Sequence, residues 1–226
     1  MGKTIERIAL ERGHTIAGRI DIDNVADLGT ARADVAIEFS HPDAAFENVK
    51  KCIQRRIPTV CGTTGWLDRR EEVENLTRET GSTFFYASNY SLGVNLFFKL
   101  NEHLARMMNQ FSAYEVSIDE VHHVQKKDAP SGTAITLAEG VIRNLDRKKT
   151  WVKAQQRGRE EAIEINSFRI DDVPGTHVIK WASAIDDIEI KHTAHTREGF
   201  ALGAVMVAEW IRDKKGVLNI DDFLKL

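Results

Sequence analysis

The feature that most limits the fold of this chain is an alternation of short apolar strands with helices in its first ninety residues. Strand patterns occur at 34–40, 57–62 and 82–88, and helical patterns occur between them at 41–56 and 68–81. Strands that alternate with helices are joined by right-handed crossovers and lie parallel in one sheet. This part of the chain is therefore predicted to be an α/β unit.

The chain opens on a helical pattern at 4–12, which is followed by a predicted strand at 14–21. Dinucleotide-binding units have a strand and a G-x-G-x-x-G turn before such a helix, because the glycines let the backbone approach a pyrophosphate. Gly2 stands where the last glycine of that turn would be, and Asp21 stands where an acid would bind an adenosine ribose. The alternative is a simple terminal glycine and a loop acid.

The pattern changes after residue 90, where a long helix is predicted. A strand at 114–123 follows, with Tyr114, Val116, Ile118 and Glu120 on one face. A helix is expected from Gly132, then β-rich stretches at 151–155, 162–170 and 176–195, and a buried helix at 197–216. We predict an α+β second domain with a mixed sheet at 92–197, and a first domain made of 1–91 and 198–226.

Charge, hydropathy and cysteine content exclude several classes of protein. A net charge of −3 does not favour a nucleic-acid partner, and no apolar run is long enough to span a membrane. The opening residues lack the apolar core of a signal peptide. Cys52 and Cys61 are too few for a zinc cage and are interpreted as free thiols of a reducing compartment, so a cytoplasmic location is expected.

The stretch EVHHVQKKDAPSGTA, residues 120–134, concentrates the residues that can do chemistry. His122 can give or take a proton near neutral pH, and Lys126 can hold a carboxylate or donate a proton. His122 and His123 point to opposite faces of a strand, so a two-histidine metal site is not expected. The free N–H groups of Ser131, Gly132 and Thr133 would form an anion site at a helix start. The alternative is a polar loop before a capped helix.

Two further segments follow parallel strands at the end of a sheet where α/β proteins bind ligands. In the first, CGTTGW, the candidates are Gly62, Thr63 and Thr64. In the second, FYASNYSLGVN, they are Ala87, Ser88, Asn89 and Tyr90, of which Asn89 could pair with a nicotinamide amide. Either segment could also be an ordinary strand-to-helix turn.

Together these stretches resemble the dihydrodipicolinate reductase (4-hydroxy-tetrahydrodipicolinate reductase) family. VHHVQKKDAPSGTA is similar to the family signature H-H-x-x-K-x-D-A-P-S-G-T-A, and GTTGW and ASNYSLGVN resemble its two cofactor segments. The resemblance implies a Rossmann-like dinucleotide-binding domain, a substrate-binding and tetramerisation domain, and assembly into a homotetramer. It implies NAD(P)H-dependent reduction of 4-hydroxy-tetrahydrodipicolinate, with loss of water, in lysine and diaminopimelate biosynthesis.

The resemblance also implies roles for single residues. His122 and Lys126 would be catalytic, while His123, Gly132 and Thr133 would bind the dicarboxylate substrate. Contacts to the cofactor would come from Asp21, Gly62, Thr63, Thr64, Ala87, Ser88, Asn89 and Tyr90. An acid at position 21 would favour NADH over NADPH, because it repels a 2′-phosphate. No metal is expected.

The start of the chain departs from the family pattern, which has a strand and a glycine-rich turn before the first helix. The fold is therefore expected to be an N-terminally incomplete Rossmann-like domain. Two explanations stand: the recorded start is an internal Met of a longer enzyme, or the chain is a truncated, non-catalytic form. The second form would bind dicarboxylate and assemble, but would bind cofactor poorly. We expect the first.

Overall fold

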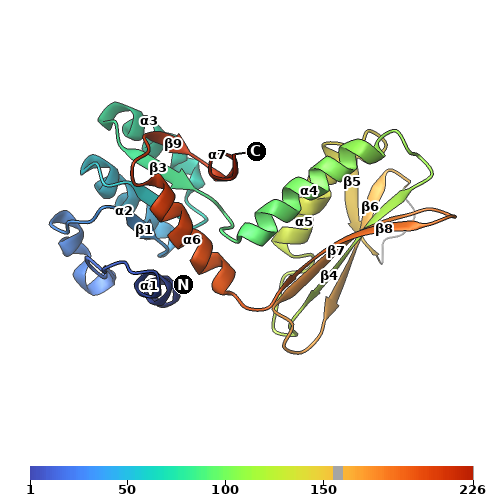
Figure 1. The fold of residues 1–226 in the computed structure, drawn as a ribbon, viewed down its shortest axis with the longest axis horizontal. Helices are drawn as coiled ribbons and strands as arrows, with labels where there is room; N and C mark the ends of the chain where they lie inside the picture. Colours follow the sequence, from blue (N-terminus) through green and yellow to red (C-terminus); the bar gives the residue numbers. More distant parts are fainter. Residues whose placement is uncertain (155–159, 226) are drawn as a thin grey trace. The chain divides into compact units, whose positions relative to one another are not determined.

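The computed structural model describes residues 1–154 and 160–225. It divides into two compact units, drawn in Figure 1. Unit 1 comprises Met1–Leu92 and Glu198–Leu226, and unit 2 comprises Gly93–Arg197. Unit 1 contains a parallel sheet and unit 2 a mixed sheet, so the predicted α/β class is confirmed.

The sheet of unit 1 has the strand order β1-β2-β3-β9, and every pairing in it is parallel. Its strands are β1 (Ala36–Glu38), β2 (Thr59–Cys61), β3 (Thr83–Tyr86) and β9 (Gly216–Leu218). The unit also contains α1 (Gly2–Glu11), α2 (Pro42–Gln54), α3 (Arg70–Thr80), α6 (Glu198–Ile211), α7 (Ile220–Leu224) and the short 3₁₀ segments η1 (Ile22–Gly29) and η2 (Leu67–Arg69).

Helices cover both faces of this sheet because its strands are apolar on both sides. Val60 and Phe85 are buried in a core with residues of α1 and α6. The neighbouring positions Cys61 and Phe84 point the other way, into a core with residues of α2 and α3. Successive side chains of a strand face opposite sides, so a continuous apolar run produces this three-layer arrangement.

Local sequence signals set the ends of the helices. Pro42 is the first residue of α2, where its missing N–H removes no helical hydrogen bond. Gly81 ends α3 with a φ of +62°, a conformation that favours glycine. In α6, a Cβ atom at Gly203 would lie 1.7 Å from the carbonyl oxygen of Tyr90. Glycine at this position therefore permits the close approach of the helix to the chain after β3.

The prediction of a strand at 14–21 is wrong. The structure has no strand there, and Asp21 instead begins η1. Its carboxylate accepts a hydrogen bond from the Ile22 N–H at 2.8 Å, and Asn24 Oδ1 accepts one from the Asp21 N–H at 2.7 Å. An extended segment becomes a strand only when a neighbour pairs with it. Among the described residues, no strand is hydrogen-bonded to 14–21.

Unit 2 contains a five-stranded sheet with the order β5-β6-β4-β7-β8. The strands are β4 (Glu115–His122), β5 (Thr150–Lys153), β6 (Ala162–Arg169), β7 (Gly175–Ala182) and β8 (Asp187–Ala194). Central β4 pairs with β6 in parallel and with β7 antiparallel. The helices of the unit are α4 (Leu92–Met108), whose first residue belongs to unit 1, and α5 (Gly132–Ile142).

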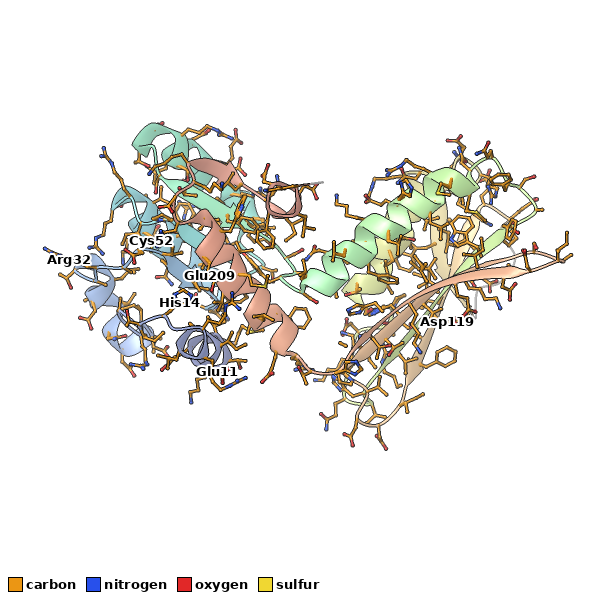
Figure 2. All side chains as sticks on the ribbon, viewed as in Figure 1. Glu11, His14, Arg32, Cys52, Asp119 and Glu209 are labelled. Atoms are coloured by element: carbon orange, nitrogen blue, oxygen red, sulfur yellow. The ribbon has the colours of Figure 1, made fainter. Side chains whose placement is uncertain are left out.

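One face of this sheet packs on α4 and α5. Its core includes Val116, Ile118, Ile179 and Trp181, as the alternation in the sequence predicted for the strand at 114–123. On the opposite face lie Asp119, which is labelled in Figure 2, and Asn166, whose Nδ2 donates to the Asp119 carboxylate at 2.6 Å. Phe168 is 47 % exposed on this second face.

The other predicted elements differ from the structure in detail. The stretch at 176–195 is a hairpin of two strands, β7 and β8, because Ser183 and Asp186 form a turn in the middle of it. Gln155, the end of one predicted stretch, lies outside the described residues. The short elements β9 and α7 were not predicted. No helix in the described residues is long and apolar enough to cross a bilayer.

Candidate active site

The site in unit 2 is built on the carboxyl end of β4. His122 is the last residue of the strand and is buried, and Glu120 lies two positions earlier on the same face with no exposed surface. His122 Nδ1 lies 3.0 Å from Glu120 Oε2. The distance is that of a hydrogen bond, while the angles at the two atoms depart from ideal ones.

Residues of two other segments are hydrogen-bonded to Oε1, the second oxygen of the Glu120 carboxylate. The Ser131 N–H donates to Glu120 Oε1 at 3.1 Å, and the Arg169 guanidinium lies 3.2 Å from that oxygen. Burial by itself raises the pKa of Glu120, but polar contacts from His122, Ser131 and Arg169 outweigh it and hold that pKa well below its usual range. Glu120 is therefore a buried carboxylate anion that joins the strand to the start of α5.

His177 completes this buried cluster. It lies directly opposite Glu120 in the β4–β7 ladder, and its ring stacks edge-on against His122 with 5.1 Å between ring centres. Its Nε2 is hydrogen-bonded to Ser131 Oγ at 3.1 Å and lies 3.9 Å from Glu120 Oε2. Burial, together with the nearby His122, lowers the pKa of His177 to about 4, so this ring is neutral at neutral pH.

Glu120, His122 and His177 present possible metal-ligand atoms within 4.8 Å of one another. The Arg169 cation already balances the charge of the carboxylate. We interpret the cluster as a hydrogen-bonded arrangement around His122, and the expectation that the chain holds no metal stays a prediction.

Lys126 lies in the loop after β4, where its Nζ is 2.9 Å from the Asp128 carboxylate. Arg169 is hydrogen-bonded to the backbone of this loop: it donates to the carbonyl oxygens of Lys126 at 3.3 Å and of Asp128 at 2.6 Å. The ammonium group of Lys126 is therefore held on a fixed loop next to the strand that carries His122.

His123 faces away from the buried cluster, as the strand period predicted. Its Nε2 lies 3.0 Å from the guanidinium of Arg197. Both residues line an open cavity of about 310 Å³, together with Val124, Gln125, Asp171, Asp172, Val173 and Pro174. A guanidinium beside an imidazole is suited to a carboxylate ligand.

Gly132 and Thr133 occupy the first turn of α5, where Ser131 is the N-cap and its Oγ accepts from the Ala134 N–H at 3.2 Å. An added Cβ at Gly132 would meet nothing within 4 Å, so the space beside it is open. Unpaired N–H groups of a helix start attract anions. The Ser131 N–H already donates to Glu120, so the prediction that it is a free donor of the anion site is wrong, and only Gly132 and Thr133 stay candidates at the helix start that Glu120 links to His122.

In unit 1, the predicted cofactor segments lie at the carboxyl ends of β2 and β3. Gly62, Thr63 and Thr64 line an open cavity of about 340 Å³ together with Met1, Phe39, Ser40 and Pro42. A Cβ at Gly62 would lie 2.2 Å from the Phe39 ring, so only glycine leaves this wall of the cavity in place. Three of the lining residues carry hydroxyl groups: Ser40, Thr63 and Thr64.

In the second predicted cofactor segment, two of the four candidate side chains are buried. The Tyr90 side chain is buried, and its hydroxyl donates to the Cys61 carbonyl at 2.7 Å. Ala87 is also buried, whereas Ser88 is exposed and Asn89 half-buried. Asn89 Oδ1 accepts from the Ser91 N–H at 2.9 Å. Asp21 is exposed at the start of η1.

Besides Arg197, which lies beside His123, four residues of the unit 2 site were not among the predicted site residues: Glu120, Arg169, His177 and Gly175, whose ideal Cβ position lies 3.1 Å from His122 Nε2. One of them had a signal in the sequence, because Glu120 continues an otherwise apolar face, and a buried carboxylate needs partners. The other three come from β6 and β7, and no local pattern marks them.

Two models of one protein family together match nearly the whole chain. Residues 1–90 match the family model described as dihydrodipicolinate reductase, N-terminus, and residues 93–224 match that described as dihydrodipicolinate reductase, C-terminus. The chain is 48 % identical to a 4-hydroxy-tetrahydrodipicolinate reductase of Christiangramia forsetii over 99 % of this chain and 93 % of that one. It is 36 % identical to one of Archaeoglobus fulgidus, over 92 % of this chain and 82 % of that one.

Among solved structures, the fold resembles a dipicolinate-bound dihydrodipicolinate reductase from Paenisporosarcina sp. TG-14. The TM-score is 0.75 at 21 % identity, over 96 % of this chain and 84 % of that one. The N-terminal part of the matched family is a nucleotide-binding domain, which supports a pyridine nucleotide as cofactor. On the sequence matches, which span nearly the whole chain, this protein belongs to the dihydrodipicolinate reductase family.

Proposed function

We propose that this chain reduces 4-hydroxy-tetrahydrodipicolinate with NAD(P)H, with loss of water, in lysine and diaminopimelate biosynthesis. The observation that carries the proposal is the Glu120 carboxylate, which joins His122 to the N–H group of Ser131 at the start of α5. A proton-transfer group and an anion site are thereby held next to one another. In this proposal, unit 1 binds the dinucleotide and unit 2 binds the substrate.

The chain's own residues have defined tasks in this proposal. Gly132 and Thr133 bind one carboxylate of the substrate through the helix start, and His123 beside Arg197 binds carboxylate in the cavity that these two residues line. Lys126 and His122 transfer protons. Proton transfer is required for the hydroxyl group to leave as water and for the reaction to be completed. When bound, the nicotinamide supplies the hydride.

The cofactor contacts are proposed at Gly62, Thr63 and Thr64, at Ala87, Ser88, Asn89 and Tyr90, and at Asp21. For Tyr90 and Ala87 the contact would come from backbone atoms, since their side chains are buried. Asp21 favours NADH, because its carboxylate repels a 2′-phosphate. In Asp21→Ala, the ratio of kcat/KM for NADH to that for NADPH should fall; an unchanged ratio would contradict the assignment.

The main test compares the two proposed catalytic residues with exposed control residues of the same type. His122→Gln and Lys126→Ala should each lose at least about 10²-fold in kcat, a usual size for a lost proton-transfer group. Lys127→Ala and His103→Gln alter exposed side chains of the same unit and should keep wild-type rates. If the first two variants match the controls, the assignment is wrong.

Dicarboxylate binding without NADH oxidation by the wild-type chain would instead support the non-catalytic form. Titration with NADH and with 2,6-pyridinedicarboxylate separates these results, because each ligand is followed on its own.

We also propose a cytoplasmic homotetramer. The support is the second face of the unit 2 sheet, which carries exposed Phe168 and over which no helix of the described residues packs. The two buried free cysteines are consistent with a reducing compartment. Light scattering should give the mass of four chains, and Phe168→Asp should lower it; a monomeric wild-type chain would contradict the proposal.

A further inference from the structure

The two ring nitrogens of His122 have different surroundings. Nδ1 lies 3.0 Å from Glu120 Oε2 at angles that depart from those of an ideal hydrogen bond, and within the described residues no other group is hydrogen-bonded to either atom. Nε2 faces β7 at Gly175, where a Cβ atom would lie 3.1 Å from it. One nitrogen is therefore next to a fixed anion, and the other is next to a residue without a side chain.

The carboxylate is not free to turn away from His122. Its Oε1 is held by the Ser131 N–H and by Arg169, from two different elements. These donors fix the plane of the carboxylate and leave Oε2 toward His122. His177, the nearest other ring, is neutral because burial lowers its pKa to about 4, so it does not act as a competing cation for Oε2.

Gly175 has an ordinary backbone conformation, with no positive φ. Backbone strain therefore does not require glycine at this position. What a side chain would change is the space at Nε2, because a Cβ at 3.1 Å is closer than nearly all ordinary contacts. Glycine leaves room for another atom to reach Nε2.

We propose that Glu120 and Gly175 are positioning residues for His122: Glu120 holds the proton on Nδ1, and Gly175 keeps Nε2 open as the nitrogen that exchanges a proton with substrate. A carboxylate that accepts from one imidazole nitrogen fixes the tautomer and the direction of the other. The proposal rests on the proposed function of His122 in the reductase reaction.

The decisive variant is Glu120→Gln. The two donors at Oε1 need an acceptor, so the amide oxygen should take that place and the amide NH₂ should face His122. The NH₂ group then donates to Nδ1, and the imidazole proton moves to Nε2. We expect kcat to fall by about 10²-fold with KM changed less than about threefold. Glu120→Asp retains a carboxylate and should recover part of the rate.

Gly175→Ala separates the two halves of the proposal. It should keep the proton on Nδ1 but lower kcat/KM by about tenfold, because the methyl group covers Nε2. Asn101→Ala is the control for lost stability. Asn101 is buried in the same unit and donates to the Leu137 carbonyl at 2.9 Å, outside the cluster, so its removal should lower Tm and leave kcat unchanged.

The tautomer is read directly from the imidazole ¹⁵N spectrum of labelled protein, with His122 identified by its absence in His122→Gln. The expected result is an Nδ1–H signal in the wild type and in Gly175→Ala, and an Nε2–H signal in Glu120→Gln. A wild-type Nε2–H signal, or a Glu120→Gln rate within twofold of wild type, would overturn the proposal.

Two further results are distinguishable. If the wild type has the Nδ1–H tautomer but no reductase activity, the proposed function fails while the positioning by Glu120 stands. If a chelator lowers wild-type activity and zinc restores it, the cluster binds a metal ion and the proposal is wrong.

Discussion

The Arg169 guanidinium lies 3.2 Å from Glu120 Oε1 and is the cation that balances this fully buried carboxylate. The same guanidinium group donates to the carbonyl oxygens of Lys126 and Asp128. One side chain from β6 therefore supports both the strand that carries His122 and the loop that carries Lys126.

Removal of this cation should destabilise the protein strongly. Arg169→Met leaves a buried carboxylate without its partner, which costs about 3–5 kcal/mol in the free energy of unfolding. Urea unfolding measures this change. Arg143→Met, which breaks an exposed ion pair with Glu102 in the same unit, is the matched control and should cost at most about 1 kcal/mol. Equal losses in the two variants would contradict the role of Arg169.

A second ion-pair cluster should make unit 1 sensitive to acid. His14 and Glu209, both labelled in Figure 2, are hydrogen-bonded at 2.8 Å, and Arg12 donates twice to the same carboxylate at 2.7 Å. Hydrogen bonds, that from Arg12 first, lower the pKa of Glu209 to about 2. The stabilisation is present above the usual glutamate pKa of 4.5 and is lost as the pH falls toward about 2.

Glu209→Gln should therefore lower the free energy of unfolding at neutral pH. It should also make that free energy depend less on pH between these two pH values. Urea midpoints measured across that range test this. Glu79→Gln, at an exposed position on α3, should leave the wild-type profile unchanged. A Glu209→Gln profile as steep as that of the wild type would mean that other carboxylates cause the acid sensitivity.

Both cysteines should be unreactive in the folded protein. Burial raises the pKa of Cys52, and burial with the adjacent Glu38 raises the pKa of Cys61 far above its usual value. Because the thiolate is the reactive form, iodoacetamide should label neither thiol at about pH 8 until urea is added. A cysteine introduced at exposed Glu79 serves as the positive control. Fast labelling of the native wild type would contradict the burial.

The wall of the unit 1 cavity offers a test of cofactor binding. In Gly62→Ala the new methyl group would push the Phe39 ring, which already lies 2.2 Å from the ideal Cβ position, into the cavity. We expect NADH affinity to fall by at least about tenfold, as measured by fluorescence titration. Gly29→Ala, whose Cβ would meet nothing within 4 Å, should bind NADH as the wild type does. Unchanged affinity in Gly62→Ala would exclude this wall from the cofactor site.

Local patterns predicted most elements because their causes are local. Pro42 and Gly81 mark helix ends through their own backbone restrictions, and the alternation of Val116 and Ile118 shows which face of β4 is buried. The strand expected at 14–21 failed for a non-local reason: a strand exists only when another strand pairs with it. The short β9 lies next to β3 in the sheet although it is far away in the sequence.

In the candidate active site, too, contacts between residues far apart in the sequence could not be predicted from local patterns. The motif from Glu120 to Ala134 is continuous, so its histidines, lysine and helix start could be predicted together. Arg169 and His177 reach Glu120 only through the β4–β6 and β4–β7 ladders, and their register cannot be read from the motif. Tyr90 illustrates the reverse case, since it lies within a predicted cofactor segment but its side chain belongs to the core.

Because side chains alternate along β4, residue parity decides which of the two adjacent histidines joins the buried cluster. Even-numbered residues of this strand face the helices, so His122 shares a side with Glu120, and His123 does not. A single residue inserted between Val116 and Glu120 would shift the pairing register of one part of β4 with β6 and β7, and a one-residue shift turns side chains to the other face. Either the apolar face would turn outward, or the insertion would have to bulge before Glu120. The imidazole proposed to transfer the proton therefore keeps its place beside Glu120 only while the register that buries Val116 and Ile118 is kept.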